Sequence, residues 1–439
     1  MTEMHQRRVA WPRADDAEPA EGPPEGRAGL LLVPGTGRAS LEEVAERAAR
    51  AGLRRIEVLA WRDLDDPEAG GSERHAHHVA SLWAGAGIDV TMRTSAAAAR
   101  APDAERAGYH VRRRGQRYSV FPRSAARGLL RTRGRPDGLV EIWNGMPFFS
   151  PLWARCPRVA FLHHVHAEMW QMVLSPGRAR LGQLVERRLA PPFYRGTRVV
   201  TLSESSRREI VDMLHLRPER VSVVQPGIAP SFSPGPGRSP APYVLAVGRL
   251  VPVKRFELLV DALALARRSV PDLRAVIVGE GYERDRLEAH RRAVGAERWL
   301  ALPGFMDEEQ LVDQYRRAWL VASTSQREGW GMTITEAGAC ATPAVVSRIA
   351  GHVDAVEDDV TGFVVDLDRH SLPGGRADAV RAFADALVRV LGDPVLRARM
   401  GRAAQARAQR LSWEATAAGT LDALVDEALA RAPRRRAAT

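Results

Sequence analysis

Short apolar runs alternate with longer amphipathic segments along the second half of the chain. The short runs include "YVLAVG", "RAVIVGEG", "LVASTS" and "PAVVS", and the longer segments include "FELLVDALALARR", "ERDRLEAHRRAVG" and "TEAGACA". Short β-branched runs predict strands, and the longer amphipathic segments predict helices. Because strand–helix alternation is typical of a parallel sheet covered on both faces, we expect a doubly wound α/β domain here.

The first half of the chain follows a similar pattern. Strands are predicted at "RIEVLAW", "IDVTMR", "GLVEIW", "RVAFLHH", "RVVTLS" and "RVSVVQ", with helices following Glu73 and Ser205. The predicted fold class is therefore α/β, with two doubly wound, Rossmann-like domains in succession. Ligands of such sheets bind beyond the carboxyl ends of the strands, so we expect the functional residues in those loops.

A linker is predicted between the two domains, where "APSFSPGPGRSPAP" replaces any periodic pattern with Pro, Gly and Ser. Residues 1–53 are expected to be an N-terminal extension that is partly disordered, because its start is rich in Pro, Glu and Arg. Within it, "LEEVAERAARAG" has helical spacing that ends at Gly52. The predicted segments that follow are the N-terminal domain at 54–232, the linker at 233–242 and the C-terminal domain at 243–411.

The composition indicates a globular protein with an excess of positive charge. Of the 439 residues, 45% are hydrophobic and 27% are charged, and the formal net charge is +11. This charge favours anionic partners: nucleic acid, an acidic membrane surface or phosphorylated small molecules. Nine arginines lie between Arg112 and Arg135 without a nucleic-acid motif, so we interpret them as a solvated face.

The sequence also gives an expectation for the cellular location and for the role of the two cysteines. The apolar runs are shorter than a membrane span, and the acidic, Pro-containing N-terminus lacks a secretory signal, so a cytoplasmic location is expected. Cys156 and Cys340 are isolated, which predicts neither a disulfide framework nor a metal site.

The stretch "VGRLVPVKRF" contains the only lysine in the sequence, Lys254, together with Arg249. Both residues follow the predicted strand "YVLAV", which ends at Gly248. A planar guanidinium and a compact ammonium at this position would neutralise a leaving diphosphate. A solvated basic loop is the alternative interpretation.

The stretch "REGWGMTITEA" follows another predicted strand and enters a helix. The amides of Met332 and Thr333 would lie at the positive helix end, where phosphate binds readily. Glu328 and Glu336, with seven residues between them, could accept hydrogen bonds from adjacent hydroxyls of ribose or a sugar ring. A helix start with favourable acids in its first turn would give a similar pattern.

The combination of "GRLVPVK", "VGEG", "EGWGMTITE", "AGHVDAV" and "VTGFVV" closely resembles the retaining, nucleotide-sugar-dependent glycosyltransferases of family 4, which have the GT-B fold. In the first domain, "GGSERHAHHVASLWAGAGIDV" is similar to the family's Gly-Gly loop and first helix. The resemblance covers nearly the whole chain after about residue 54 and implies two domains facing across a cleft. It also implies a closing helix at 412–431, followed by a basic tail at 432–439.

The resemblance assigns a donor site. It implies that Gly71 approaches the donor diphosphate from one side while Arg249 and Lys254 hold it from the other, that Glu336 binds ribose, and that Glu328 binds the transferred sugar. The remaining donor-site residues that it implies are Gly248, Gly279, Gly281, Phe305, Met306, Gly331, Met332 and Thr333. The base, uridine or guanosine, stays open.

The resemblance also places a histidine of "FLHHVHAEMW" against the donor sugar, and His163 is the alignment choice over His164. The implied catalytic set is therefore His163, Glu328, Arg249 and Lys254. Acceptor contacts are expected from Asn144, Phe148 and His164. A zinc site at the histidines is disfavoured because no other ligand cluster appears in the sequence.

Two further points qualify the resemblance. The sequence reads "AGH" at 350–352 where many relatives have two glycines, which leaves the shape of the sugar pocket open. The triplet "DLD" occurs at 63–65 and 366–368, but neither copy has the context of a metal site. We therefore expect no catalytic metal and no cofactor other than the nucleoside diphosphate sugar as co-substrate.

The function predicted from the resemblance is hexosyl transfer, with retention, from a UDP- or GDP-type sugar to an acceptor hydroxyl. A nucleotide-sugar epimerase of the same fold is one alternative. A non-enzymatic basic protein that binds nucleic acid or a membrane surface is another, although no nucleic-acid partner is expected. Peripheral contact with an anionic membrane stays possible for the enzyme itself. A dehydrogenase is disfavoured because the G-x-G-x-x-G fingerprint after the first strand is missing.

Overall fold

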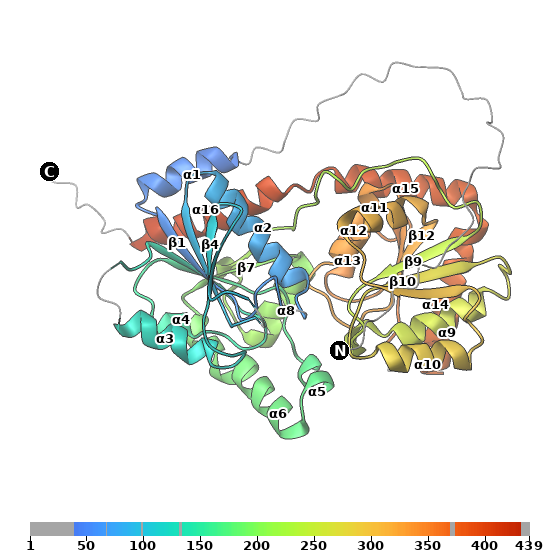
Figure 1. Ribbon diagram of the computed structural model, residues 1–439, viewed down its shortest axis with the longest axis horizontal. Coiled ribbons are helices and arrows are strands. Elements are labelled where there is room, and N and C mark those ends of the chain that lie inside the picture. Colours follow the sequence, from blue (N-terminus) through green and yellow to red (C-terminus); the bar gives the residue numbers. More distant parts are fainter. Residues whose placement is uncertain (1–38, 67, 98–99, 131–133, 369–373, 432–439) are drawn as a thin grey trace, which may run out of the picture. The chain divides into compact units, whose positions relative to one another are not determined.

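The computed structural model describes residues 39–66, 68–97, 100–130, 134–368 and 374–431, and the statements below concern these ranges. They contain two α/β domains, each built on one sheet (Figure 1). The basic tail predicted at 432–439 and most of the predicted N-terminal extension lie outside the described residues.

The sheet of the first domain is parallel except for the antiparallel pair β3–β4 at one edge. Its central strands are buried on both faces, as the near-continuous apolar runs predicted. From edge to edge the order is β3 (Asp103–Arg106), β4 (Tyr109–Arg113), β2 (Asp89–Thr94), β1 (Arg55–Leu59), β5 (Gly138–Ile142), β6 (Arg158–Phe161), β7 (Arg198–Thr201) and β8 (Val221–Val223).

Helices cover both faces of this sheet. One face is covered by α1 (Leu41–Arg50), α2 (Gly71–Gly85) and α16 (Trp413–Arg431), and Figure 1 shows α1 and α16 side by side. The remaining helices are α3 (Val120–Leu130), α4 (Ser150–Trp153), α5 (Met169–Val173), α6 (Pro176–Leu184), the π turn η1 (Val185–Leu189), α7 (Pro191–Tyr194), α8 (Glu204–Leu214) and the 3-10 turn η2 (Pro218–Arg220).

The sheet of the second domain is parallel throughout its described strands. Its order is β11 (Leu300–Gly304), β10 (Arg274–Val278), β9 (Tyr243–Val247), β12 (Leu320–Ser323), β13 (Ala344–Ser347) and β14 (Gly362–Val365). Figure 1 shows α9 (Phe256–Ala266), α10 (Arg284–Ala293) and α14 (Arg376–Gly392) on one face, and α11 (Glu308–Arg317), α12 (Met332–Ala339) and α15 (Pro394–Ala408) on the other. Two shorter elements are η3 (Pro252–Lys254) and α13 (His352–Ala355).

The strand orders confirm two doubly wound, Rossmann-like domains. In both sheets the first strand is central and the order reverses beside it, between β1 and β5 in one and between β9 and β12 in the other. Ligands of doubly wound sheets bind at such switch points, outside the carboxyl ends of the strands. The loops that follow β1, β5, β9 and β12 are therefore the expected position of the site.

The folded part of the first domain begins before the predicted border at residue 54. Helix α1, capped by Ser40, packs against α16, and Arg47 bonds Asp422 at 2.7 Å, so the folded first domain includes residues before 54. The predicted closing helix is α16, and it packs on the first domain. The predicted linker has no regular structure and is held along the second domain, where Arg316 donates to the Ser233 carbonyl at 2.8 Å.

The interpretation of residues 112–135 as a solvated face is wrong for Arg113. This side chain is 4% exposed, and its guanidinium pairs with Asp63 and, at 2.9 Å, with Asp65. Burial would raise the pKa of Asp63, but its bonds to His77 and Arg113 hold that pKa well below its usual value. The first "DLD" triplet is thus an internal partner of arginine.

The chain passes between the two domains at two places, and these two passages touch each other. Residues Ile228 and Ser412 form a β-bridge. A Cβ atom on Gly227 would lie 2.1 Å from the backbone nitrogen of Trp413, so only glycine fits there. The two passages are therefore packed backbone against backbone.

Candidate functional site

A cavity of about 1910 Å³ lies at the carboxyl ends of the strands and is lined by residues of both domains. Nearly all of the residues predicted for the site line it. They are Gly71, Asn144, Phe148, His163, His164, Gly248, Arg249, Lys254, Gly279, Phe305, Met306, Glu328, Gly331, Met332, Thr333 and Glu336.

Gly281 is the exception, because it does not line the cavity. A Cβ atom there would lie 2.2 Å from the Leu250 carbonyl oxygen, so this glycine permits close packing of two loops. Phe148 lies on the cavity wall but is 2% exposed and belongs to a core cluster with Trp153. Its ring is therefore mainly a core side chain, which weakens the prediction that it contacts the acceptor.

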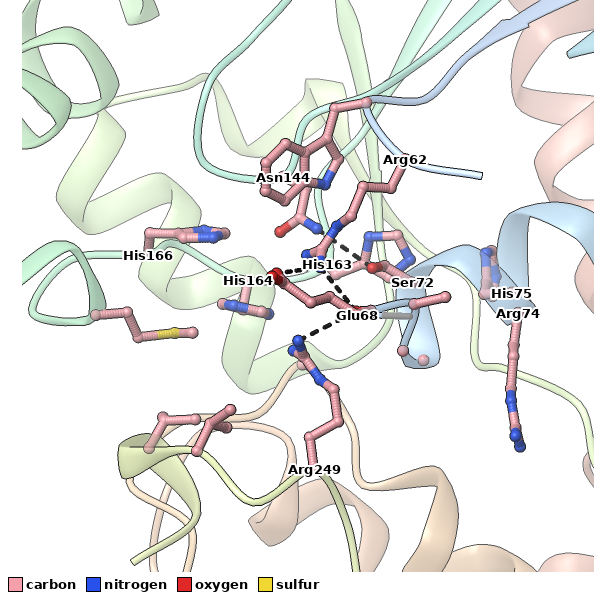
Figure 2. A pocket seen from close by; sticks show the side chains of 18 of the residues that line it. Arg62, Glu68, Ser72, Arg74, His75, Asn144, His163, His164, His166 and Arg249 are labelled. Carbon is pink, nitrogen blue, oxygen red and sulfur yellow. Dashed lines mark hydrogen bonds and ion pairs between the residues drawn. The ribbon is translucent and has the colours of Figure 1, made fainter. Parts of the chain in front are cut away.

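The glycine loop before α2 meets the cationic loop after β9. A Cβ atom on Gly70 would lie 3.2 Å from Arg249 Nε, and one on Gly71 would lie 3.1 Å from Met332 Cε. Figure 2 shows Arg62 and Arg249 both directed at Glu68, whose carbonyl accepts from them at 2.7 and 3.3 Å. The glycine loop thus lies next to Arg249, while the predicted approach of Gly71 to a donor diphosphate stays a prediction.

Arg62 and Glu73 form a buried pair beside this loop, and neither residue is among those predicted for the site. Arg62 Nε lies 3.5 Å from a Glu73 oxygen, and Glu73 also accepts from the Gly70 amide at 2.8 Å. Burial opposes ionisation of Glu73, but Arg62 keeps its pKa below the usual value. The carboxylate therefore fixes the glycine loop at the start of α2.

Lys254 pairs with Glu328 across the second domain's switch point. Glu328 also accepts from the Ser325 hydroxyl at 2.9 Å. Burial alone would raise the pKa of Glu328, but the Lys254 ammonium holds it below its ordinary value. The Glu328 carboxylate thus holds the Lys254 side chain at the cavity wall.

Glu336 lies on α12, the helix that follows the loop carrying Glu328. It accepts a hydrogen bond from the Tyr315 hydroxyl at 2.9 Å, and burial raises its pKa. Tyr315 is fully buried on α11 and was not predicted from the sequence, since nothing in its own segment marks it. Its hydroxyl fixes the direction of the Glu336 carboxylate.

The N-terminus of α12 faces the same cavity. Gly331, at φ 108°, begins the helix, and the first intrahelical bond from this end runs from the Ile334 amide to the Gly331 carbonyl. The amides of Met332 and Thr333 precede that bond, so they point out of the helix end. Such amides, at the positive end of the helix dipole, suit an anionic oxygen.

Histidines of the loop after β6 line the first-domain side. His163 is 6% exposed, lies 5.2 Å from the His75 ring centroid, and burial lowers its pKa to about 4. His164 stacks on His166 with ring centroids 5.0 Å apart, and burial also lowers the pKa of both. At neutral pH these rings are uncharged, so each can donate one hydrogen bond and accept another.

A buried carboxylate holds the histidine loop in place. Glu186, on the π turn η1, accepts from the amides of His166 and Ala167 at 2.7 and 3.1 Å and from the indole of Trp170 at 2.9 Å. Single π turns inside helices often occur at functional sites. The sequence carries no local signal for this role.

Asn144 follows β5 and donates to the Ser72 hydroxyl at 3.2 Å, which ties the predicted acceptor loop to the start of α2 (Figure 2).

The "AGH" segment at 350–352, where many relatives have two glycines, is packed into the second domain. His352 is buried, and its Nδ1 lies 3.1 Å from the Ser347 carbonyl. Gly351 has φ 82°, and a Cβ there would lie 2.7 Å from the Trp330 nitrogen. This segment thus packs directly against the loop that carries Glu328.

Within the described ranges, no group of three or more His, Cys, Asp or Glu side chains could hold a metal ion. In the same ranges, no helix has both the length and the apolar character needed to cross a bilayer.

Two family models match consecutive parts of the chain. The model described as Glycosyltransferase Family 4 matches residues 69–232, and the model described as Glycosyl transferases group 1 matches residues 233–407. The border between them falls at the start of the predicted linker. A curated relative, D-inositol 3-phosphate glycosyltransferase from Kineococcus radiotolerans, is 35% identical over 245 residues, which are 51% of this chain and 56% of that protein. The chain thus spans little more than half the length of the curated relatives it matches.

Solved structures share the fold over most of the chain. Sucrose-phosphate synthase from Thermosynechococcus elongatus has a TM-score of 0.69 at 21% identity, and covers 84% of this chain and 97% of its own. Anabaena HepE, solved in complex with UDP and glucose, has a TM-score of 0.63 at 21% identity, and covers 86% of this chain and 99% of its own. At these identities the likeness concerns the fold.

Proposed function

Because the chain belongs to family 4 of the glycosyltransferases and has the GT-B fold, we propose that it transfers a hexosyl group from a nucleoside diphosphate sugar to an acceptor hydroxyl, with retention at the anomeric carbon. One observation carries the proposal. Arg249, Lys254 and the first amides of α12 line one cavity together with Glu336.

In the proposed reaction, the bond between the anomeric carbon and the diphosphate oxygen breaks, and the acceptor oxygen bonds to that carbon on the same face. The acceptor proton passes to the departing phosphate. Negative charge grows on the diphosphate as the bond breaks, so Arg249, Lys254 and the α12 amides would act most strongly in the transition state.

The pairing of Lys254 with Glu328 fits this scheme. The carboxylate holds the Lys254 side chain at the cavity wall, and a bound diphosphate would compete for it. Glu328 would then be available to accept from a hydroxyl of the transferred sugar. Glu336, directed by Tyr315, would accept from the ribose hydroxyls.

The donor base and the metal requirement also belong to the proposal. Phe305, 68% exposed, and Met306 follow β11 at the cavity and would contact the base. We propose that catalysis uses no metal ion, because cationic side chains and helix amides surround the position proposed for the diphosphate. Activity that disappears with a chelator and returns with manganese would contradict this part.

The experiment that tests the proposal begins with thermal unfolding in the presence of UDP, GDP, ADP and their common sugars. A ligand that binds only the folded state raises the unfolding temperature. At a hundredfold excess over Kd, it raises the free energy of unfolding by about 2.7 kcal/mol. The stabilising donor is then incubated alone and with alcohols, and the products are resolved. No stabilisation by any nucleoside diphosphate would contradict the proposal.

Two other functions are separated by the same samples. An epimerase of this fold would convert the donor sugar with no acceptor present. A basic protein that only binds nucleic acid or an anionic membrane would transfer no sugar, and its affinity would fall steeply with salt. For the enzyme itself, peripheral contact with an anionic membrane from a cytoplasmic position is part of the proposal.

A further inference from the structure

The cavity has an arm that the donor site does not use. The arm is formed by α3, α4, α5 and α6 of the first domain, and its lining includes Phe121, Leu129, Leu152, Trp170, Met172 and Leu181. We refer to these six residues as the apolar arm. The whole cavity of about 1910 Å³ exceeds the roughly 300–1,000 Å³ typical of one small ligand. Space for a second ligand is therefore present beside the proposed donor.

The arm offers little hydrogen bonding. Among the described residues of these four helices that line the cavity, Arg178 alone is charged. The two indole N–H groups are already used, since Trp153 donates to the Phe148 carbonyl and Trp170 to Glu186, both at 2.9 Å. A polyhydroxylated ligand lying here would leave its hydroxyls without partners, which is costly.

The arm is also accessible and firmly built. Leu129, Leu152 and Leu181 are 62%, 59% and 58% exposed, so their side chains face open space. Helices α3 and α6 lie directly on tryptophan rings. A Cβ atom on Gly128 would lie 2.2 Å from the Trp153 ring, and one on Gly182 would lie 2.6 Å from the Trp170 ring. The apolar side chains are therefore presented by packed helices.

We propose that the acceptor is an amphiphilic alcohol, whose apolar body of alkyl or aryl groups lies in the apolar arm while its hydroxyl reaches the donor sugar beside His164. This inference rests on the proposed function, because it takes the open arm as the acceptor's place. Continuity of the arm with the cavity that holds Arg249 and Glu336 supports it. An acceptor such as inositol phosphate would instead require a polar wall.

The test measures binding of methyl, hexyl and octyl β-glucosides, below their micelle concentrations, to the full chain by calorimetry. Each buried methylene contributes up to about a fourfold gain in affinity, so octyl glucoside should bind at least about tenfold more tightly than methyl glucoside. Leu129→Gln and Leu181→Gln should each reduce octyl glucoside affinity several-fold. Leu429→Gln is the matched control, since Leu429 is 54% exposed on α16 and does not line the cavity.

Equal affinity along the series, or an equal loss in Leu429→Gln, overturns the proposal. Binding to vesicles of phosphatidylglycerol and phosphatidylcholine that needs Leu129 and Leu181, together with a flat glucoside series, would identify the arm as a membrane contact and also overturn it. Donor binding is measured separately by thermal unfolding with nucleoside diphosphates. Failure there with a steep glucoside series would reject the proposed function and not the apolar subsite.

Discussion

Lys254 is the only lysine in a sequence that otherwise uses arginine. Its aliphatic stem passes so close to the backbone that a Cβ on Gly248 would lie 3.2 Å from Lys254 Cε. A compact ammonium on an unbranched stem suits this position, while the wide, planar guanidinium of arginine needs more space. The single lysine is thus explained by the shape of the loop as well as by its charge.

Replacement of Lys254 tests its charge. We expect Lys254→Ala to lower kcat about a hundredfold, since loss of one group that stabilises the transition state costs about 3 kcal/mol. Lys254→Arg, which keeps the charge in a larger shape, should retain more activity than the alanine variant. Steady-state kinetics with unfolding curves as a control decide the matter, and near-normal turnover of Lys254→Ala would remove the assigned role.

Glu336 and Tyr315 form a pair whose effect should appear in donor binding. Tyr315→Phe removes the hydroxyl that orients the carboxylate and leaves Glu336, whose pKa burial already raises, easier to protonate. We expect donor affinity to fall about fivefold in Tyr315→Phe and further in Glu336→Gln. Calorimetry with the nucleoside diphosphate provides the measurement. If Glu336→Gln binds the donor as well as the parent chain, the ribose assignment is wrong.

His163 should make stability depend on pH. Its pKa is about 4 in the folded chain, below the usual value near 6.5. As pH falls from about 6.5 to 4, the unfolded chain gains a proton that the folded chain does not, so stability is lost in this window. Between pH 7 and pH 4, the parent chain should lose up to about 3 kcal/mol more than His163→Gln. Urea titrations of both chains at pH 7 and pH 4 measure the two losses of stability. The buried carboxyl groups are present in both chains, so their contribution cancels when the two losses are compared. Parallel losses in the two chains would refute it.

At the scale of elements, apolar runs predicted the buried central strands well. The strand β11 is absent from that prediction because it lies at a sheet edge, buries only alternate residues and contains a proline. The β3–β4 pair is also absent, since both strands are rich in charged residues, and the burial of Arg113 on β4 depends on its pairing with Asp63 and Asp65. An internal ion pair forms only when the chain folds, so it produces no alternation of apolar and polar residues that would predict a strand.

The site residues fall into two similar groups, those that the sequence predicted and those that it did not. Residues carried by contiguous motifs, such as Arg249, Lys254 and Glu336, were placed at the cavity by sequence reasoning, although their catalytic and binding roles remain predictions. Tyr315 and Glu186 were not found, because they reach the site from helices that precede or follow the motif by many residues. Packing between elements decides such contacts.

The π turn η1 offers a test of this second group. We expect Glu186→Ala to destabilise the chain by about 2–3 kcal/mol, because the amides of His166 and Ala167 lose a charged or strongly polar partner. Glu186→Gln keeps one acceptor oxygen and should lose less. Urea unfolding measures both, and chemical shifts of the His164 and His166 rings should move in each. An unchanged unfolding midpoint in Glu186→Ala would show that the loop is held by other contacts.

At the scale of the molecule, polar contacts join α8 to α13 and to the loop that carries Arg327 in the second domain. The Ser205 hydroxyl pairs with Asp354 and accepts from the Gly351 amide at 2.8 Å. Arg327 pairs with Glu209 at 2.7 Å. These contacts lie next to Glu328, so the position of the domains and the shape of the sugar pocket are coupled.

A double-mutant cycle measures this coupling. Ser205→Ala and Asp354→Ala should show an interaction energy of about 1.5–3 kcal/mol, the range for a hydrogen bond to a charged group. The control cycle pairs Asp354→Ala with Glu204→Ala, whose side chain bonds Arg207 on its own helix, and should be additive. Additivity in both cycles would indicate that the Ser205 contact does not couple the domains.

The touching passages at Gly227 and Trp413 determine how the cleft can widen. Because both covalent connections run through this one contact, a rotation of one domain away from the other would pivot there. We expect Gly227→Ala, which places a methyl group at this contact, to change the angle between the two domains without replacing any residue that lines the cavity.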